Sequence, residues 1–173
     1  MRMILATLFV VGLAACADTH QVHRGHEAAN KLSPDGTAYI SVPENGRYGH
    51  TVYGSSGVMA TQIVAAAFGR HMRRIEQASS PQSLDKTLEA ARKAGATYLV
   101  EPSILHWEDR ATEWSGIRDK VELRISVMDA VSGKVLETAV VSGSSGWATL
   151  GGDHPQDLLP KPTQEYVDGL FGR

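Results

Sequence analysis

The side chains best suited to chemistry are concentrated in the stretch HWEDRATEWSG, residues 106–116, which holds four charged residues, two tryptophans and a histidine. Carboxylates and histidine are the groups that most hydrolases use as general acids and bases. They are also zinc ligands, and the later sequence GGDHP adds Asp153 and His154 to the set. A cell-wall-directed or metal-dependent hydrolase of this kind would use four residues: His106, Glu108, Glu113 and His154.

The spacing of these residues weakens the hydrolase hypothesis. If a strand continues past residue 105, the carboxylates of Glu108 and Asp109 point to opposite faces and form a poor acid–base pair. Glu113 could supply a second carboxylate only if the loop folds back. The sequence has no HxH, HExxH or CxxC spacing, and neither G-S-S-G segment fits the GxSxG pattern of serine hydrolases. We therefore expect no catalytic residues, no metal site and no cofactor.

The same stretch has the composition of a docking surface, because tryptophan and arginine are among the residues that dominate binding energies at interfaces. The alternative is a strand end and a polar loop, with Arg110 paired to an acid and the tryptophans half-buried. The loop between two antiparallel strands lies at one end of a sheet, and the segment SSGWATLGG could reach that end. The candidate partner-binding residues are Trp107, Glu108, Asp109, Arg110, Glu113, Trp114, Trp147, Asp153 and His154.

The first sixteen residues indicate where the protein is located. Arg2 precedes an uncharged, mostly apolar run over residues 3–15, which suits a secretory signal and is shorter than the roughly 20 residues that span a bilayer. The run ends in LAAC, which resembles the lipobox of bacterial lipoproteins. That resemblance implies removal of residues 1–15 and acylation of Cys16, whose several acyl chains would hold the protein at a membrane. With Ala17 after the cysteine, it also favours the periplasm-facing leaflet of the outer membrane, whereas Asp18 at the next position leaves the inner membrane as the alternative.

Residues 16–36 are expected to form the lipidated end and a flexible tether, because they are polar and show no periodicity before the turn signal SPDG. The tether contains His20, His23 and His26, three residues apart. On a helix these side chains would lie near one face and could bind a metal weakly, whereas Gly25 and the composition favour a solvated linker.

Composition limits what the remaining part, residues 37–173, can be. If Cys16 carries lipid, no thiol is left for a disulfide or a cysteine nucleophile, so the fold depends on its core. About 140 residues suffice for one such core and one domain. The net charge of −2 argues against a nucleic-acid partner, which requires a basic face.

The hydrophobic pattern of this part alternates between strand and helix periods, in the order β-α-β-α-β-β-β-α. Strands are expected at 37–42, 73–79, 96–110, 120–129 and 134–144, and the second of these at a sheet edge. Helices are expected after the YGSSG sequence (with Met59, Ile63, Ala66 and Ala67 apolar), at 80–95, and around Tyr166, Leu170 and Phe171. Ser55 or Ser56 as a helix N-cap explains YGSSG better than phosphate binding. The fold class is therefore α/β: a single domain with a mixed β-sheet ending in an antiparallel meander.

Three segments carry a family resemblance: YISVPENGRYGHTVYGSSG, ATYLVEPSILHWEDRATEWSG and GGDHPQDLL. Together they resemble a family of small proteobacterial lipoproteins classified as a domain of unknown function. The order of strands and helices is more distantly similar to the curli secretion lipoprotein and the amino-terminal domain of TolB. These resemblances imply a non-catalytic binding or envelope-assembly module with an envelope protein as its partner. Nothing in the sequence indicates the surface that a homo-oligomeric ring would need.

Overall fold

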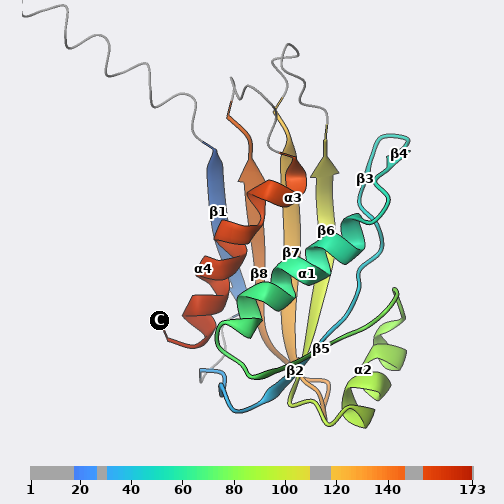
Figure 1. The fold of residues 1–173 in the computed structure, drawn as a ribbon, viewed down its shortest axis with the longest axis vertical. Helices are drawn as coiled ribbons and strands as arrows, with labels where there is room; N and C mark the ends of the chain where they lie inside the picture. Colours follow the sequence, from blue (N-terminus) through green and yellow to red (C-terminus); the bar gives the residue numbers. More distant parts are fainter. Residues whose placement is uncertain (1–17, 27–30, 110–117, 147–153, 173) are drawn as a thin grey trace, which may run out of the picture.

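Strands of both orientations form the centre of the molecule, a six-stranded sheet in the order β1-β8-β7-β6-β2-β5 (Figure 1). The computed structural model describes residues 18–26, 31–109, 118–146 and 154–172. The strands of the sheet are β1 (Thr19–His26), β2 (Thr37–Ile40), β5 (Arg74–Gln77), β6 (Tyr98–Glu108), β7 (Lys120–Asp129) and β8 (Val135–Ser144). A separate hairpin pairs β3 (Arg47–Tyr48) with β4 (Thr51–Val52), and the helices are α1 (Ser56–Gly69), α2 (Leu84–Lys93), α3 (Pro155–Leu158) and α4 (Pro160–Leu170).

The parallel part of the sheet confirms three predicted strands. Strand β2 pairs in parallel with both β5 and β6, and β5 lies at the edge of the sheet as expected. Helix α2 begins at Leu84 rather than at Ser80, with Ser83 as its N-cap residue. Gly95 follows this helix with φ +69°, a left-handed conformation that glycine adopts without strain.

The predicted antiparallel meander is also confirmed, because β6 pairs with β7 and β7 with β8. The alternation of the β7 sequence holds throughout most of the strand. Its inward-facing residues are Val121, Leu123, Ile125 and Val127, all of them buried in the main core cluster. This regular alternation is the reason that the strand could be predicted from the sequence.

Strand β1 corrects the prediction of a flexible tether, which is wrong for residues 19–26. The strand pairs antiparallel with β8, from Thr19 opposite Ser144 onward. Its inward-facing side chains include only one apolar residue, Val22. The sequence of this strand therefore shows no alternation of apolar and polar residues that would predict it. His20 instead lies 3.5 Å from Glu165 of α4, and Arg24 lies 3.3 Å from Glu137 of β8. The three histidines therefore lie along a strand and share no helix face.

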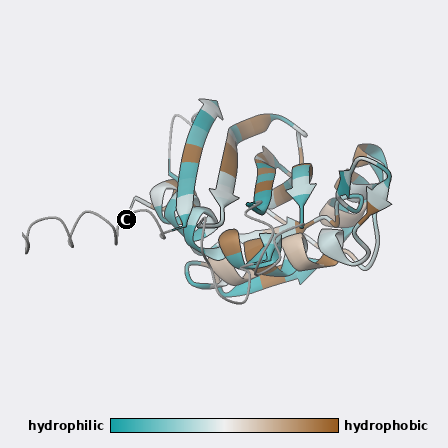
Figure 2. Cartoon of the chain, turned by 90° about the horizontal axis from the view of Figure 1, so that it is seen from above, coloured by the Kyte–Doolittle hydropathy of each residue, from teal (hydrophilic) through white to brown (hydrophobic). Residues whose placement is uncertain are grey.

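Among the described residues, helices cover both faces of the sheet, three on one face and one on the other. Helices α1, α3 and α4 cover one face, where they pack on the main core (Figure 1). Helix α2 covers one end of the opposite face, where Ala91 packs with Leu99 and Met128. Apolar and hydrophilic segments alternate along the strands when the molecule is seen from above (Figure 2). Within the described part of the chain, no helix is both long and apolar enough to cross a membrane.

Candidate functional site at one end of the sheet

Four neighbouring strands meet at one end of the sheet in a single row of residues. We call this the terminal row: Thr19, Ser144, Lys120 and Glu108, each opposite the next in the strand pairing. Strands β6 and β8 end here, and strands β1 and β7 begin here (Figure 1). The docking hypothesis places its residues at this end of the sheet, and it stays a prediction.

Hydrogen bonds tie the strands together just beyond the terminal row. The Asp18 carboxylate accepts a bond of 2.9 Å from the Gly146 N–H, which joins the start of β1 to the end of β8. The Ser145 N–H donates to the Asp119 carbonyl at 3.0 Å, and the Asp119 N–H donates to the Ser145 hydroxyl at 2.9 Å. This end of the sheet is therefore held by specific polar contacts as well as by the strand ladder.

A β-bulge decides which way each residue at the end of β6 faces. Ile104 is opposite Leu123 and His106 is opposite Glu122, so Leu105 is the extra residue of the bulge. The shift turns Trp107 into the core, where it is only 2% exposed. Trp107 was expected to contact a partner or to be half-buried, and both expectations are wrong: it packs beneath the loop at Gly46 and supports the site from inside.

His106 and Glu108 lie on the opposite face of β6 from Trp107, as the strand geometry predicted. Their side chains are 3.0 Å apart, from Nε2 of His106 to Oε2 of Glu108. The ring of Tyr48, from the β3–β4 hairpin, meets the His106 ring edge-on at a centroid distance of 5.5 Å. Glu108 is buried and His106 about one-third exposed, so the pair forms part of the packing under the hairpin.

Asp109 and His154 are brought together from distant parts of the sequence. Oδ1 of Asp109 lies 3.1 Å from Nδ1 of His154, and this hydrogen bond, with the negative charge of Asp109, raises the pKa of His154. His154 is the N-cap residue of α3, and its N–H donates to the Asp157 carboxylate at 3.2 Å. The start of α3 is therefore tied to the end of β6 by a contact that strengthens when His154 is protonated.

The predicted hydrolase residues fall into separate pairs. His106 and Glu108 lie on one face of the sheet, whereas His154 lies with Asp109 at the start of α3, which packs on the other face. No three potential metal ligands gather anywhere within residues 18–26, 31–109, 118–146 and 154–172. Five predicted site residues lie outside the described residues: Arg110, Glu113, Trp114, Trp147 and Asp153.

The pKa of His154 gives a direct test of its contact with Asp109. We expect the His154 ring to titrate above the usual 6.5, and to return toward that value in Asp109→Asn. Because the pKa is raised in the folded protein, the contact contributes fully below pH 6.5 and fades as the pH rises through the folded value. Titration of the histidine ring protons by NMR measures both proteins, and an unchanged midpoint in the variant would contradict the contact.

A polar crevice beside β6 was missed by the sequence analysis. It has a volume of about 500 Å³ and opens where residues 41–47, beyond the end of β2, diverge from residues 101–106. The Val100 carbonyl accepts the Ser41 N–H, so by alternation the backbone of Pro102 also faces β2, and proline has no N–H to continue the ladder. Partial burial in this crevice raises the pKa of Glu101. The feature of the sequence that could have predicted the crevice is Pro102, because a proline interrupts the hydrogen bonds between two strands.

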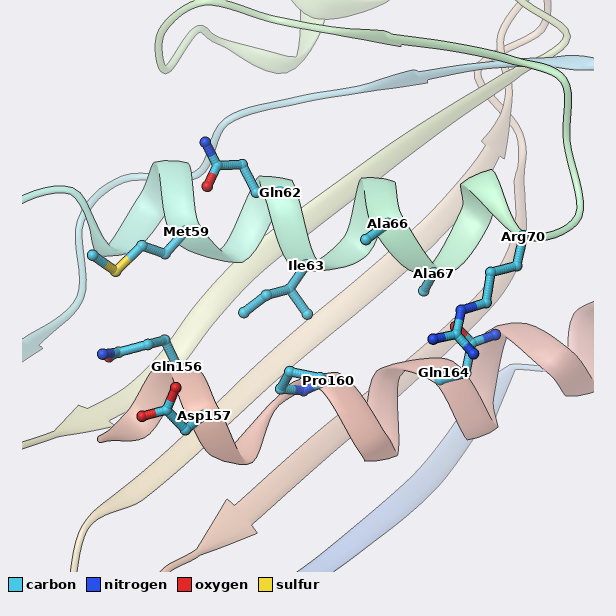
Figure 3. A pocket seen from close by; sticks show the side chains of 10 residues that line it. All are labelled: Met59, Gln62, Ile63, Ala66, Ala67, Arg70, Gln156, Asp157, Pro160 and Gln164. Atoms are coloured by element: carbon cyan, nitrogen blue, oxygen red, sulfur yellow. The ribbon is translucent and has the colours of Figure 1, made fainter. Parts of the chain in front are cut away.

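Helix α1 packs one side on the core and lines a groove with another. Ala60, Val64 and Phe68 are fully buried, whereas Met59, Ile63 and Ala66 line a groove of about 410 Å³ between α1 and helices α3 and α4 (Figure 3). Gln156, Asp157 and Pro160 form the facing wall, and Arg70 and Gln164 close one end (Figure 3). Of the four predicted apolar residues, Ala67 is buried, Met59 and Ile63 are half-buried against the main core, and Ala66 is exposed.

The YGSSG segment serves close packing at the start of α1. Ser55 is the N-cap residue but makes no side-chain cap bond, whereas the Ser56 hydroxyl accepts the Gly46 N–H at 2.8 Å and donates to the Tyr53 carbonyl at 2.7 Å. The Gly57 N–H donates to the Asn45 side chain at 3.1 Å. A Cβ at position 57 would collide with the Pro43 carbonyl, so glycine is required. This explains the motif without an anion.

Comparisons with known proteins agree with this architecture. The sequence matches the family described as "Domain of unknown function (DUF4823)" over residues 30–170. No curated protein matches it. The solved structure of PelC from Paraburkholderia phytofirmans, described as a dodecamer, is similar at a TM-score of 0.69 and 17% identity, covering 90% of this chain and 99% of PelC.

A second solved structure is more remote. Protein XCC0632 from Xanthomonas campestris, of family DUF330, has a TM-score of 0.50 and 10% identity, covering 85% of this chain and 88% of its own. At these identities both comparisons establish a shared fold and no shared activity.

Proposed function

Because this chain belongs to the DUF4823 family, a domain of unknown function, we propose a role from the site itself: a lipoprotein that is anchored through Cys16 and docks an envelope protein without catalysing a reaction. The docking surface is the terminal row and the polar residues around it. The match to a family of unknown function agrees with the resemblance noted in the sequence, which implies a small lipoprotein. The anchor rests on the LAAC sequence and on Cys16 as the only cysteine in the chain.

The single observation that supports the docking surface is the pairing of Asp109 with His154 at the terminal row, from residues 45 positions apart. These are two of the residues that the sequence singled out for partner binding, and they are part-exposed while Trp107 is buried beneath. A polar end that is held by hydrogen bonds and supported by a buried tryptophan is suited to holding a partner in a defined orientation. The separation of His106 and Glu108 from His154 supports a non-catalytic role over a hydrolase that uses all three.

Location in the outer membrane belongs to the same proposal. Ala17, rather than aspartate, follows Cys16, which fits the sorting pattern of outer-membrane lipoproteins. Fractionation of cells that express the full chain is expected to place it with outer-membrane markers, labelled with palmitate at Cys16. The Cys16→Ser variant is expected to lose both the label and the membrane association.

Site-specific crosslinking tests the docking surface. A photo-crosslinking residue at Lys120, exposed in the terminal row, is expected to capture an envelope protein in cells. The matched control places the same crosslinker at Val131, which is 74% exposed in the β7–β8 turn at the other end of the sheet. The product should disappear in Trp114→Ala. Equal capture at both positions, or none at Lys120, would refute the proposed surface.

The likeness to PelC favours one second candidate, which is assembly with further copies of the same chain. PelC of P. phytofirmans is a dodecamer, and the two chains share nearly their whole length in fold. The same crosslinking experiment separates the candidates, because a product with an integral multiple of the chain's own mass indicates self-assembly. Any other mass indicates a different envelope protein.

A further inference from the structure

We infer that the terminal-row end of the domain faces the lipid surface of the membrane that holds Cys16, so that docking takes place at the membrane and not at a distance from it. This inference rests on the proposed function, because it requires the lipid on Cys16. The surface that this end faces is the layer of lipid headgroups, beside which the protein partner docks on the terminal row, and the inference assigns an orientation to the whole domain.

The length of chain between Cys16 and the sheet carries the argument. Only Ala17 and Asp18 separate the cysteine from Thr19, the first residue of β1. Three steps along an extended chain span at most about 10 Å. A tether over residues 16–36 would have let the domain move far from the membrane, but β1 uses eight of those residues as a paired strand.

The contact of Asp18 shortens the free connection further. Its carboxylate accepts the Gly146 N–H at 2.9 Å, so Asp18 is held against the end of β8. Ala17 is then the one residue between the acylated cysteine and a residue bonded to the folded domain. The whole terminal row is three strand spacings wide, about 14 Å, so all four of its residues stay near the anchor.

Charge at this end is compatible with a lipid surface. Arg118 and Lys120 are exposed, and cations near a membrane are attracted to anionic headgroups. The nearby carboxylates of Glu108 and Asp119 are buried and Asp109 is bonded to His154, whereas Asp18 and Asp157 are exposed. Exposed charges of both signs therefore lie at this end, and the orientation rests on the length of the connection to Cys16. The opposite end, at the β7–β8 turn with Val131, lies about 30 Å away along β7, which has ten residues.

Energy transfer from two labelling sites measures this orientation. The acylated Cys16 has no free thiol, so Lys120→Cys or Val131→Cys gives the full lipidated chain one reactive cysteine for a donor dye. Each protein is reconstituted into vesicles of phosphatidylethanolamine and phosphatidylglycerol with an acceptor on the headgroups. We expect transfer several-fold more efficient from position 120 than from position 131. Equal transfer, or more from position 131, would overturn the inference.

A variant with a longer connection is the matched control. Twenty glycine and serine residues inserted between Ala17 and Asp18 keep both the Asp18 contact and β1 while they release the domain from the anchor. The difference between the two dyes should largely vanish, and a difference that survives would also overturn the inference. Mass spectrometry of Cys16 distinguishes failure of the proposed anchor from failure of the orientation. A chain without lipid refutes the anchor, whereas a lipidated chain with equal transfer refutes only the orientation.

Discussion

Replacing Trp107 with alanine is expected to lower the free energy of unfolding by about 3–5 kcal/mol, the usual cost of truncating a buried aromatic side chain. Trp107 is the largest fully buried side chain among the described residues, and it is 2% exposed. The β-bulge at Leu105 places it in the core. Its Cβ lies directly under Gly46, so the cavity would open beneath the loop that connects β2 to the β3–β4 hairpin. The bond from the Gly46 N–H to the Ser56 hydroxyl holds that loop in place and so opposes its collapse into the space.

Urea denaturation of the chain without its lipid measures this effect, with Leu105→Ala as the matched control. Leu105 is two residues away on the same strand and 42% exposed, so its truncation should change the free energy of unfolding by no more than about 0.5 kcal/mol. A Trp107→Ala protein as stable as Leu105→Ala would contradict the buried position. Partner capture lost in Trp107→Ala is then a consequence of unfolding and not evidence of a contact.

Replacing Arg24 with alanine is expected to cost about 2–3 kcal/mol, because the guanidinium joins the edge strand β1 to the core. Its Nη1 lies 3.3 Å from Oε1 of Glu137, whose side chain is only 3% exposed. The guanidinium also lies 5.6 Å from the centre of the Tyr166 ring and packs against Gly169 of α4. The cost stays below that of a fully buried pair because Arg24 is about 30% exposed.

The ion pair between Arg74 and Glu76 provides the control for Arg24. It is 3.8 Å long, with side chains that are 68% and 44% exposed, so Arg74→Ala should change stability by less than about 0.5 kcal/mol. Hydrogen exchange is expected to show faster opening of β1 in Arg24→Ala and unchanged exchange in β7 at the same pH. Equal destabilisation by the two substitutions would show that β1 is held by its ladder alone.

The sequence by itself determined the elements whose pattern is local. The alternation of residues 120–129, Gly95 after a helix, and the edge character of the strand at Arg74 all follow from periodicity and backbone preference, and each was confirmed. The mixed sheet with its antiparallel meander follows from the order of those elements. The family was likewise recognisable from its sequence segments.

Only the tertiary structure decided what depends on partners distant in the chain. Strand β1 is held by Glu137, Tyr166 and Glu165 more than by apolar residues, so no local hydrophobic pattern marked it. The bulge at Leu105 is set by the register with β7, and it alone puts Trp107 inside. The pairing of Asp109 with His154 requires that β6 and α3 meet. Periodicity reports which residues share a face of one element, whereas register and docking are decided by the neighbouring elements.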